Sequence, residues 1–117
     1  MAAKTKAQDI IDNNAVAVFS KSWCPYCKAS KALLSEMGAK PYIIELDQVG
    51  AYKKNSDDDI VLRQVHDGAA IQDALQEITN QRSVPNIFID KKHIGGNSDL
   101  QAKRSELPSL LKSAHAI

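Results

Sequence analysis

The chain has 117 residues and a formal net charge of +1 at pH 7. This length predicts a single domain over residues 1–117 that can bury a hydrophobic core. So small a net charge provides no electrostatic field for nucleic acid or an anionic membrane, and no apolar run is long enough for a transmembrane helix. The first eight residues lack the apolar segment of a signal peptide, so we expect a cytoplasmic protein.

Helix and strand patterns alternate over the first 46 residues. In chain order we expect a helix over 4–13, a strand over 15–20, a helix over 25–37 and a strand over 41–46. The first strand, AVAVFS, is a continuous apolar run, which is typical of a strand buried on both faces of a sheet. Pro25 suits the first position of a helix, and Gly38 is a natural stop. The strand, helix and strand form a right-handed βαβ unit with parallel strands.

The pattern resumes in the last third of the chain. Residues 69–79 have apolar side chains at helical spacing, which predicts an amphipathic helix. Beyond it we expect a strand over 86–90, a turn at Lys91–Lys92, a strand that starts at His93 and ends at Gly95–Gly96, and closing helices over 98–104 and 107–115.

The segment between Gly50 and Asp67 does not follow this alternation. Its first half is polar and includes three consecutive aspartates, and an apolar run follows them. The polar half favours a solvated, mobile insertion at about 50–65. The alternative is a short helix that is capped by Ser56 and ended by Gly68, with the aspartates in its first turn.

Cys24 and Cys27 are the two cysteines of the chain. A disulfide between them would close so short a loop that it would constrain the unfolded chain little, so reactivity explains the pair better than stability does. The strand-to-helix junction places Cys24 at a helix N-terminus, where free N–H groups stabilise a thiolate, and Lys21 adds positive charge. Cys27 lies one turn later on the same face, near enough to close a disulfide with Cys24.

A zinc site and a purely structural role are the alternatives for the cysteine pair. A structural zinc ion needs four ligands, and the histidines, His66, His93 and His115, are not paired at a ligand spacing. Two inert buried cysteines are the other alternative, against which Pro25 at the helix start argues. A C-x-x-C motif beside a βαβ unit is typical of thioredoxin-like proteins, but it does not select one family.

Three motifs select the family. They are Lys21–Cys27 (KSWCPYC), Ser83–Pro85 (SVP) and Gly95–Asp99 (GGNSD). In this order and spacing the chain resembles the dithiol glutaredoxins of the thioredoxin superfamily, over about 15–49 and 67–113. The resemblance implies an α/β, thioredoxin-like fold, a four-stranded mixed sheet flanked by helices.

The resemblance also implies roles for single residues. Cys24 would be the nucleophile that forms a mixed disulfide with glutathione, and Cys27 would be the resolving cysteine. Lys21 and Gln72 would hold the glycine carboxylate of glutathione, with help from Arg82.

The remaining implied contacts run along the rest of glutathione. Tyr26 would line the groove, Val84 would pair its backbone with the cysteinyl part, and Pro85 would follow a cis peptide bond. Ser98 and Asp99 would hold the γ-glutamyl end. The implied glutathione site is Lys21, Tyr26, Gln72, Arg82, Val84, Pro85, Gly96, Ser98 and Asp99.

Each of these residues also has an ordinary structural interpretation. Lys21 and Gln72 are compatible with solvated surface positions, and Ser98 with Asp99 is compatible with a simple helix cap. The chain departs from the family pattern at Ser83, where threonine is commoner, at Asp90–Lys91, where an Asn-Gly-like turn is usual, and at the insertion. Gln72 lies just beyond the insertion, so its assignment depends most on how that segment folds.

The expected activity is a glutathione-dependent thiol–disulfide oxidoreductase that reduces protein–glutathione mixed disulfides and protein disulfides. Glutathione would be a co-substrate, no metal is expected, and the partners would be glutathionylated or disulfide-containing proteins, with no nucleic acid or membrane. We expect a monomer. Two alternatives stay open: a dimer that binds an iron–sulfur cluster through Cys24 and glutathione, against which Pro25 argues, and a thioredoxin-type reductase.

Overall fold

The computed structural model describes residues 3–47, 52–54, 61–64 and 68–117. One six-stranded sheet runs through them in the order β3-β4-β2-β1-β5-β6. Its strands are β1 (Val16–Ser20), β2 (Tyr42–Glu45), β3 (Tyr52–Lys54), β4 (Val61–Gln64), β5 (Asn86–Ile89) and β6 (Lys92–Gly95). The helices are α1 (Ala3–Asn13), α2 (Pro25–Glu36), α3 (Gly68–Thr79), α4 (Asn97–Ala102) and α5 (Leu107–Ser113). Among the described residues, no helix has the length and apolar character needed to cross a membrane.

The four strands predicted from the sequence form the mixed sheet β2-β1-β5-β6, in a thioredoxin-like arrangement. β1 pairs in parallel with β2, as the βαβ unit requires, and antiparallel with β5. The sheet is wider than expected, because β3 and β4 extend it beyond β2. Neither strand was predicted from the sequence, because the polar residues and three aspartates of the 50–65 segment are typical of a solvated loop.

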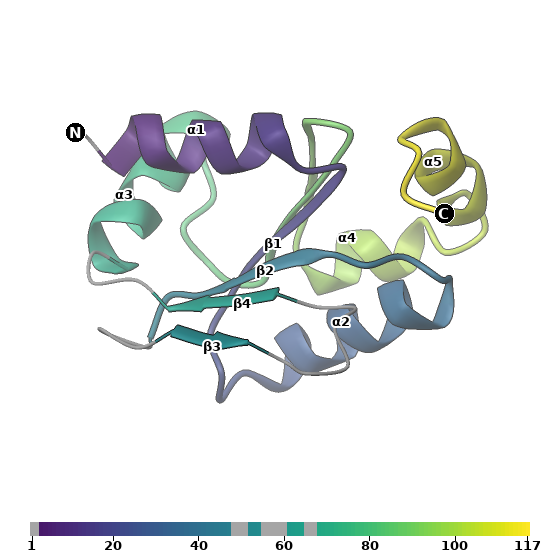
Figure 1. Ribbon diagram of the computed structural model, residues 1–117, viewed down its shortest axis with the longest axis horizontal. Helices are drawn as coiled ribbons and strands as arrows, with labels where there is room; N and C mark the ends of the chain where they lie inside the picture. Colours follow the sequence, from purple (N-terminus) through teal and green to yellow (C-terminus); the bar gives the residue numbers. More distant parts are fainter. Residues whose placement is uncertain (1–2, 48–51, 55–60, 65–67) are drawn as a thin grey trace.

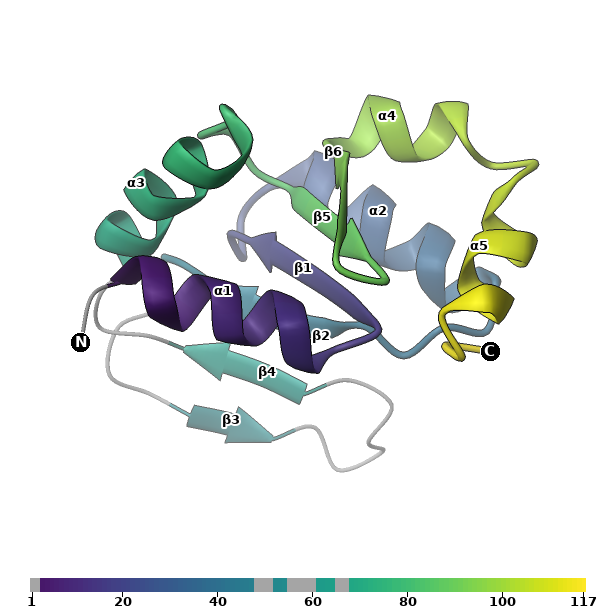
Figure 2. The same ribbon diagram turned by 90° about the horizontal axis from the view of Figure 1, so that it is seen from above.

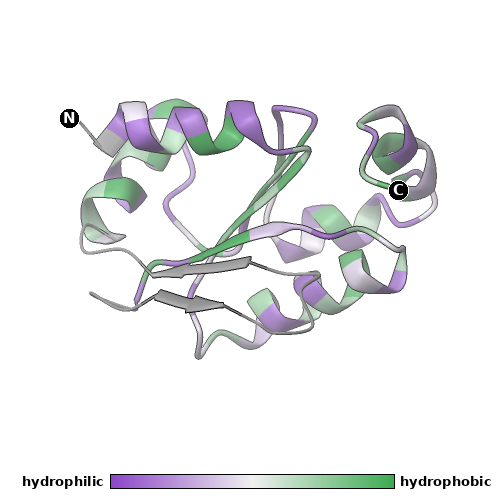
Figure 3. Ribbon diagram, in the orientation of Figure 1, coloured by the Kyte–Doolittle hydropathy of each residue, from purple (hydrophilic) through white to green (hydrophobic). Residues whose placement is uncertain are grey.

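Two hydrophobic clusters pack on opposite faces of the sheet. The alternation along β1 divides them, since Ala17 and Phe19 belong to one cluster and Val16 and Val18 to the other. The first cluster lies under α1 and α3, and the second lies under α2, α4 and α5 (Figures 1 and 2). Every residue of β1 is buried, as its continuous apolar run predicts. Figure 3 shows this strand as a largely hydrophobic segment between helices that carry polar residues.

Gly68 begins α3 and does not end a helix. A Cβ atom at this position would overlap the carbonyl oxygen of Leu46, so glycine allows α3 to start against the end of β2. The other residues of the alternative short helix, Ser56 and the aspartates 57–59, lie outside the described residues. Residues 61–64, which that interpretation made helical, form β4.

The hairpin between β5 and β6 turns at Asp90 and Lys91, one residue earlier than predicted. Both residues have positive φ angles, 53° and 67°, as a two-residue type I′ turn requires. Lys92 therefore pairs with Ile89 in the strand. An Asp-Lys pair is unusual in this turn, where Asn-Gly or Asp-Gly is typical, so the turn was difficult to place from the residue types alone.

Candidate functional site

Cys24 lies where β1 passes through a short loop into α2. It is the N-cap residue of α2, and Pro25 follows in the first turn, as the sequence predicts. Its backbone N–H donates to the Lys21 carbonyl at 3.1 Å, which closes the loop into a turn. Its sulfur accepts the Cys27 backbone N–H at 3.2 Å, so an unpaired donor of the helix N-terminus faces the thiol. This contact is of the kind that stabilises a thiolate.

Asp47, just beyond β2, anchors the loop that carries Cys24. Its Oδ1 accepts the Ser22 backbone N–H at 2.9 Å, and its Oδ2 accepts the Ser22 hydroxyl at 2.6 Å. A carboxylate with two hydrogen bonds to one residue fixes both the direction and the position of the loop. The parallel pairing of β1 with β2 makes this contact possible, because parallel strands end at the same edge of the sheet.

Cys27 differs from Cys24 in its environment. Its side chain is fully buried, and burial, together with its hydrogen bond to Cys24, raises the pKa of Cys27 to about 11. The Cys27 thiol is therefore almost entirely protonated at pH 7. Because the thiolate is the nucleophile, Cys27 does not compete with Cys24 for a first attack on a disulfide.

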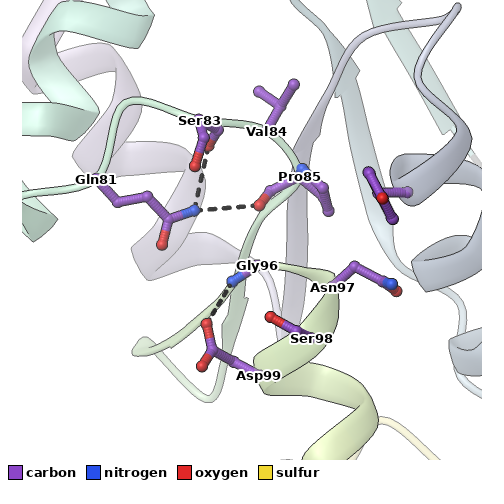
Figure 4. A pocket seen from close by; sticks show the side chains of 9 residues that line it. Gln81, Ser83, Val84, Pro85, Gly96, Asn97, Ser98 and Asp99 are labelled. Carbon is purple, nitrogen blue, oxygen red and sulfur yellow. Dashed lines mark hydrogen bonds between the residues drawn. The ribbon is translucent and has the colours of Figure 1, made fainter.

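A pocket of about 410 Å³ opens beside the thiol. Val84 connects the two, since its carbonyl oxygen lies 4.0 Å from the Cys24 sulfur. The Val84–Pro85 peptide bond is cis, as the sequence resemblance implies. Figure 4 shows segment 81–85 and the start of α4 on opposite sides of the pocket. The lining residues are Tyr26, Gln81, Ser83, Val84, Pro85, Gly96, Asn97, Ser98 and Asp99.

The wall around Asp99 depends on two glycines. Asp99 Oδ2 accepts the Gly96 backbone N–H at 3.0 Å (Figure 4). Gly95 has a φ of +119°, and a Cβ atom there would overlap the Asp99 carboxylate. Glycine thus lets the chain pass close beside the carboxylate. His93 lies nearby on β6, where burial lowers its pKa and the charge of Asp99 opposes that effect.

The structure divides the predicted glutathione residues into two groups. Tyr26, Val84, Pro85, Gly96, Ser98 and Asp99 all line the pocket. The other three lie outside its lining: Lys21 is in the loop before Cys24, Gln72 is on α3, and Arg82 follows that helix. Their roles in glutathione binding remain predictions.

Gln72 and Arg82 lie together, although neither lines the pocket. Gln72 Nε2 donates to the Arg82 carbonyl at 2.8 Å, so α3 is held against the segment that leads to Val84. The Arg82 guanidinium pairs with Asp73, and both side chains are largely exposed. Such exposed pairs are weak, so Arg82 can exchange Asp73 for an anionic ligand at little cost.

Three pocket residues were missed as site residues: Gln81, Ser83 and Asn97. Asn97 joins the two helices of the site, because its Oδ1 accepts the Ser30 hydroxyl at 2.9 Å and Gln101 Nε2 at 3.2 Å. Ser83 lies in the SVP motif and Asn97 in the GGNSD motif, so membership of these motifs could have identified both as site residues. Gln81 precedes its motif, and nothing in the sequence distinguishes it.

The geometry supports thiol–disulfide exchange. It combines one thiol at a helix N-terminus, a second buried thiol one turn later, and a pocket that begins beside the first. The described part of the chain contains no group of three or more His, Cys, Asp or Glu side chains that could hold a metal ion.

Comparisons with known proteins agree with this chemistry. A family model described as Glutaredoxin matches residues 16–58 and 53–94. A glutaredoxin of Ricinus communis is 44% identical over 117 residues, which cover 98% of this chain and 99% of the relative. The solved structure of a buckwheat glutaredoxin–glutathione complex is 38% identical, covers 98% of this chain and 92% of its own, and superposes with a TM-score of 0.80. A wheat glutaredoxin structure has a TM-score of 0.82 at 42% identity, over 98% of this chain and 95% of its own.

Proposed function

The chain belongs to the glutaredoxin family, and on that premise we propose how its residues reduce protein–glutathione mixed disulfides and protein disulfides. Family membership makes it a glutathione-dependent thiol–disulfide oxidoreductase. The assignment of roles to single residues rests on the position of the Cys24 sulfur. It accepts a helix N-terminal N–H and lies 4.0 Å from the Val84 carbonyl at the border of the pocket.

The first step transfers glutathione to the enzyme. The Cys24 thiolate attacks the glutathione sulfur of a mixed disulfide, the bond from that sulfur to the substrate protein breaks, and the substrate leaves as a thiolate that takes up a proton. A second glutathione thiolate then attacks the glutathione sulfur on Cys24. Oxidised glutathione leaves, and the Cys24 thiolate returns.

Cys27 serves a second route, the reduction of protein disulfides. Cys24 first forms a mixed disulfide with one substrate sulfur, and Cys27 then loses its proton and attacks the Cys24 sulfur. The substrate leaves as a dithiol, and the enzyme holds a Cys24–Cys27 disulfide that two glutathione molecules reduce. The raised pKa of Cys27 reserves it for this later step.

Glutathione would lie along the pocket from Tyr26 to Asp99. Val84 would pair its backbone with the cysteinyl part, which sets the glutathione sulfur beside Cys24. Ser98 and Asp99 would receive the γ-glutamyl end. The glycine carboxylate would extend toward the cations Lys21 and Arg82, near Gln72, whose side chain ties α3 to the segment that leads to Val84.

The test is a steady-state assay with hydroxyethyl disulfide, reduced glutathione and glutathione reductase. Wild type and Cys27→Ser should turn over, and Cys24→Ser should fall to the uncatalysed rate. With a protein disulfide as substrate, Cys27→Ser should be inactive while wild type is active. An inactive wild type, or an active Cys24→Ser variant, would contradict the proposal. In the first case the protein should be purified anaerobically and its spectrum searched for an iron–sulfur chromophore.

The proposal includes a monomer in the cytoplasm. A protein of this activity needs a reducing compartment where glutathione is plentiful. Light scattering of the reduced protein with and without glutathione would test the monomer. Microscopy of a carboxyl-terminal fluorescent fusion would test the location.

A further inference from the structure

Gln81 is a pocket residue to which neither the family resemblance nor the proposed function gives a role. Its side-chain nitrogen Nε2 donates to the Ser83 carbonyl at 3.1 Å and to the Pro85 carbonyl at 3.2 Å (Figure 4). Carbonyl oxygens only accept hydrogen bonds, so the amide nitrogen must face them. The amide oxygen Oε1 therefore faces the other way, as Figure 4 shows. Both amide hydrogens hold the segment around Val84, and the oxygen is left to accept from a ligand.

The backbone of Gln81 is also held from both sides. Its N–H donates to the Thr79 hydroxyl at 3.1 Å, and its carbonyl accepts Asn86 Nδ2 at 3.3 Å. Asn86 is buried, and its Oδ1 lies 2.9 Å from His93 Nε2. Since Asn86 Nδ2 is the donor to Gln81, its Oδ1 must accept, and His93 carries its proton on Nε2. An acceptor fixed in this way needs little further ordering when a ligand binds.

The side of the pocket opposite Gln81 contains a second acceptor. A Cβ atom on Gly96 would lie 4.0 Å from Gln81 Nε2, so Gly96 brings the start of α4 near the Gln81 amide. Asp99 is bonded to the Gly96 N–H and contributes a carboxylate. The described residues that line the pocket include no lysine or arginine. A ligand group with several N–H donors and a positive charge, an ammonium group, fits this pair of acceptors.

We propose that Gln81 Oε1 accepts a hydrogen bond from the α-ammonium group of the γ-glutamyl residue of glutathione, with Asp99 as the charged partner. The proposal rests on the proposed function and adds a specificity-determining residue to it. Gln81 would make the pocket select peptides that present a free α-amino group. The same side chain would hold the Val84 segment, so recognition of the γ-glutamyl end and placement of the sulfur at Cys24 would be linked.

The test separates the two uses of the Gln81 amide. In a Cys27→Ser background, Cys24 is equilibrated with the symmetrical disulfide of a peptide. Mass spectrometry then gives the equilibrium constant for forming the mixed disulfide between Cys24 and that peptide, and two peptides are compared. One is glutathione, and the other is glutaryl-cysteinylglycine, which lacks only the α-amino group. Gln81→Lys keeps donors for the Ser83 and Pro85 carbonyls and removes the acceptor. Gln76→Lys, an exposed α3 position that does not line the pocket, controls for the change in net charge, and the neutral Gln81→Ala controls for repulsion between a lysine in the pocket and the ammonium group.

We expect Gln81→Lys to lower the exchange constant for glutathione by about 10-fold or more, as for a lost hydrogen bond to a charged group. The constant for the deamino peptide should change by less than about 2-fold, and Gln76→Lys should leave both constants unchanged. Should the lysine variant unfold, Gln81→Ala with the same peptides gives the same comparison. Equal losses for both peptides, or no loss for either, would overturn the proposal. If wild type still turns over with glutathione, the proposed function survives that result.

Discussion

The two ends of the site are assembled in different ways. The thiol end, residues 20–27, is one continuous stretch that runs from the last residue of β1 to Cys27 in α2. The recognition end combines two segments distant from it in sequence, residues 81–85 and 95–99. Within the thiol end, neighbours along the chain make the key contacts, such as the Cys27 N–H on the Cys24 sulfur. The recognition end is held by residues of neighbouring strands, because Asn86 of β5 donates to the Gln81 carbonyl and accepts from His93 of β6.

This difference implies different sensitivities to mutation. Changes at Cys24 and Cys27 should alter chemistry and leave ligand affinity nearly unchanged, whereas Lys21 and Tyr26 of the same stretch belong to the predicted glutathione contacts. Changes at the recognition end should alter affinity and leave the intrinsic reactivity of Cys24 intact.

The largest expected effect concerns the ionisation of Cys27. In Cys24→Ser, burial still holds the pKa of Cys27 above the ordinary thiol value of 9.0, although loss of the Cys24 hydrogen bond brings it below about 11. Its alkylation rate should rise about tenfold per pH unit between pH 7 and 9, because only the thiolate reacts. Thiolate absorbance during a pH titration gives the midpoint. A midpoint below 9.0 would show that burial does not control this group.

At the recognition end, Asp99→Asn should raise the KM for a glutathionylated substrate by about 10- to 100-fold with kcat nearly unchanged, since a hydrogen bond to a charge is lost. Asp90→Asn, in the exposed β5–β6 turn, is the matched control and should change neither constant. Steady-state kinetics of the three proteins would decide. A fall in kcat at constant KM would place Asp99 in the chemistry and would break the contrast between the ends.

The contact between Ser22 and Asp47 tests how the thiol end is held. Asp47→Ala removes both hydrogen bonds to Ser22 and should lower the free energy of unfolding by about 1–2 kcal/mol. Ser22→Ala removes only the hydroxyl contact and should cost less. Urea denaturation of reduced protein gives both values. Equal stability of Asp47→Ala and wild type would mean that the loop holds its position without this carboxylate.

The smallest effect is a pH dependence of stability from His93. Its pKa is lowered in the folded protein, so below about pH 6.5 the unfolded chain binds more protons than the folded one. Stability should therefore fall as the pH drops through 6.5 and should not depend on His93 above it. His93→Gln, which keeps a donor for Asn86, should remove this component of the pH profile. An identical profile for the variant would contradict the assignment.

The sequence predicted the part of the thiol end whose contacts are local, but not the contact of Ser22 with Asp47, which depends on the pairing of β1 with β2. The apolar run of β1, Pro25 and the cysteine spacing together place Cys24 at the N-cap of α2, where the structure has it. At the recognition end, only residues that belong to the family motifs were predicted. Val84, Gly96 and Asp99 line the pocket as expected, but the role of Gln81 depends on hydrogen bonds to Asn86 and Pro85 that only the folded chain brings together.

The edge of the sheet was the least predictable part of the fold. β4 takes its place by pairing in parallel with β2, and among the described strands β3 is paired with β4 alone. Strand formation there depends on a neighbouring strand more than on the intrinsic preference of the residues. The aspartates of this segment are typical of a solvated loop. The sequence pattern does not show that the edge of β2 is available for pairing with a further strand.

The most direct test of the account is to trap the intermediate that joins the two ends. Cys27→Ser protein is treated with oxidised glutathione, and its mass and a peptide map are recorded before and after reduced glutathione is added. The account predicts one glutathionyl group per chain on Cys24, and its complete release by reduced glutathione with recovery of the free thiol. A protein that forms no adduct, or an adduct that reduced glutathione does not remove, would contradict it.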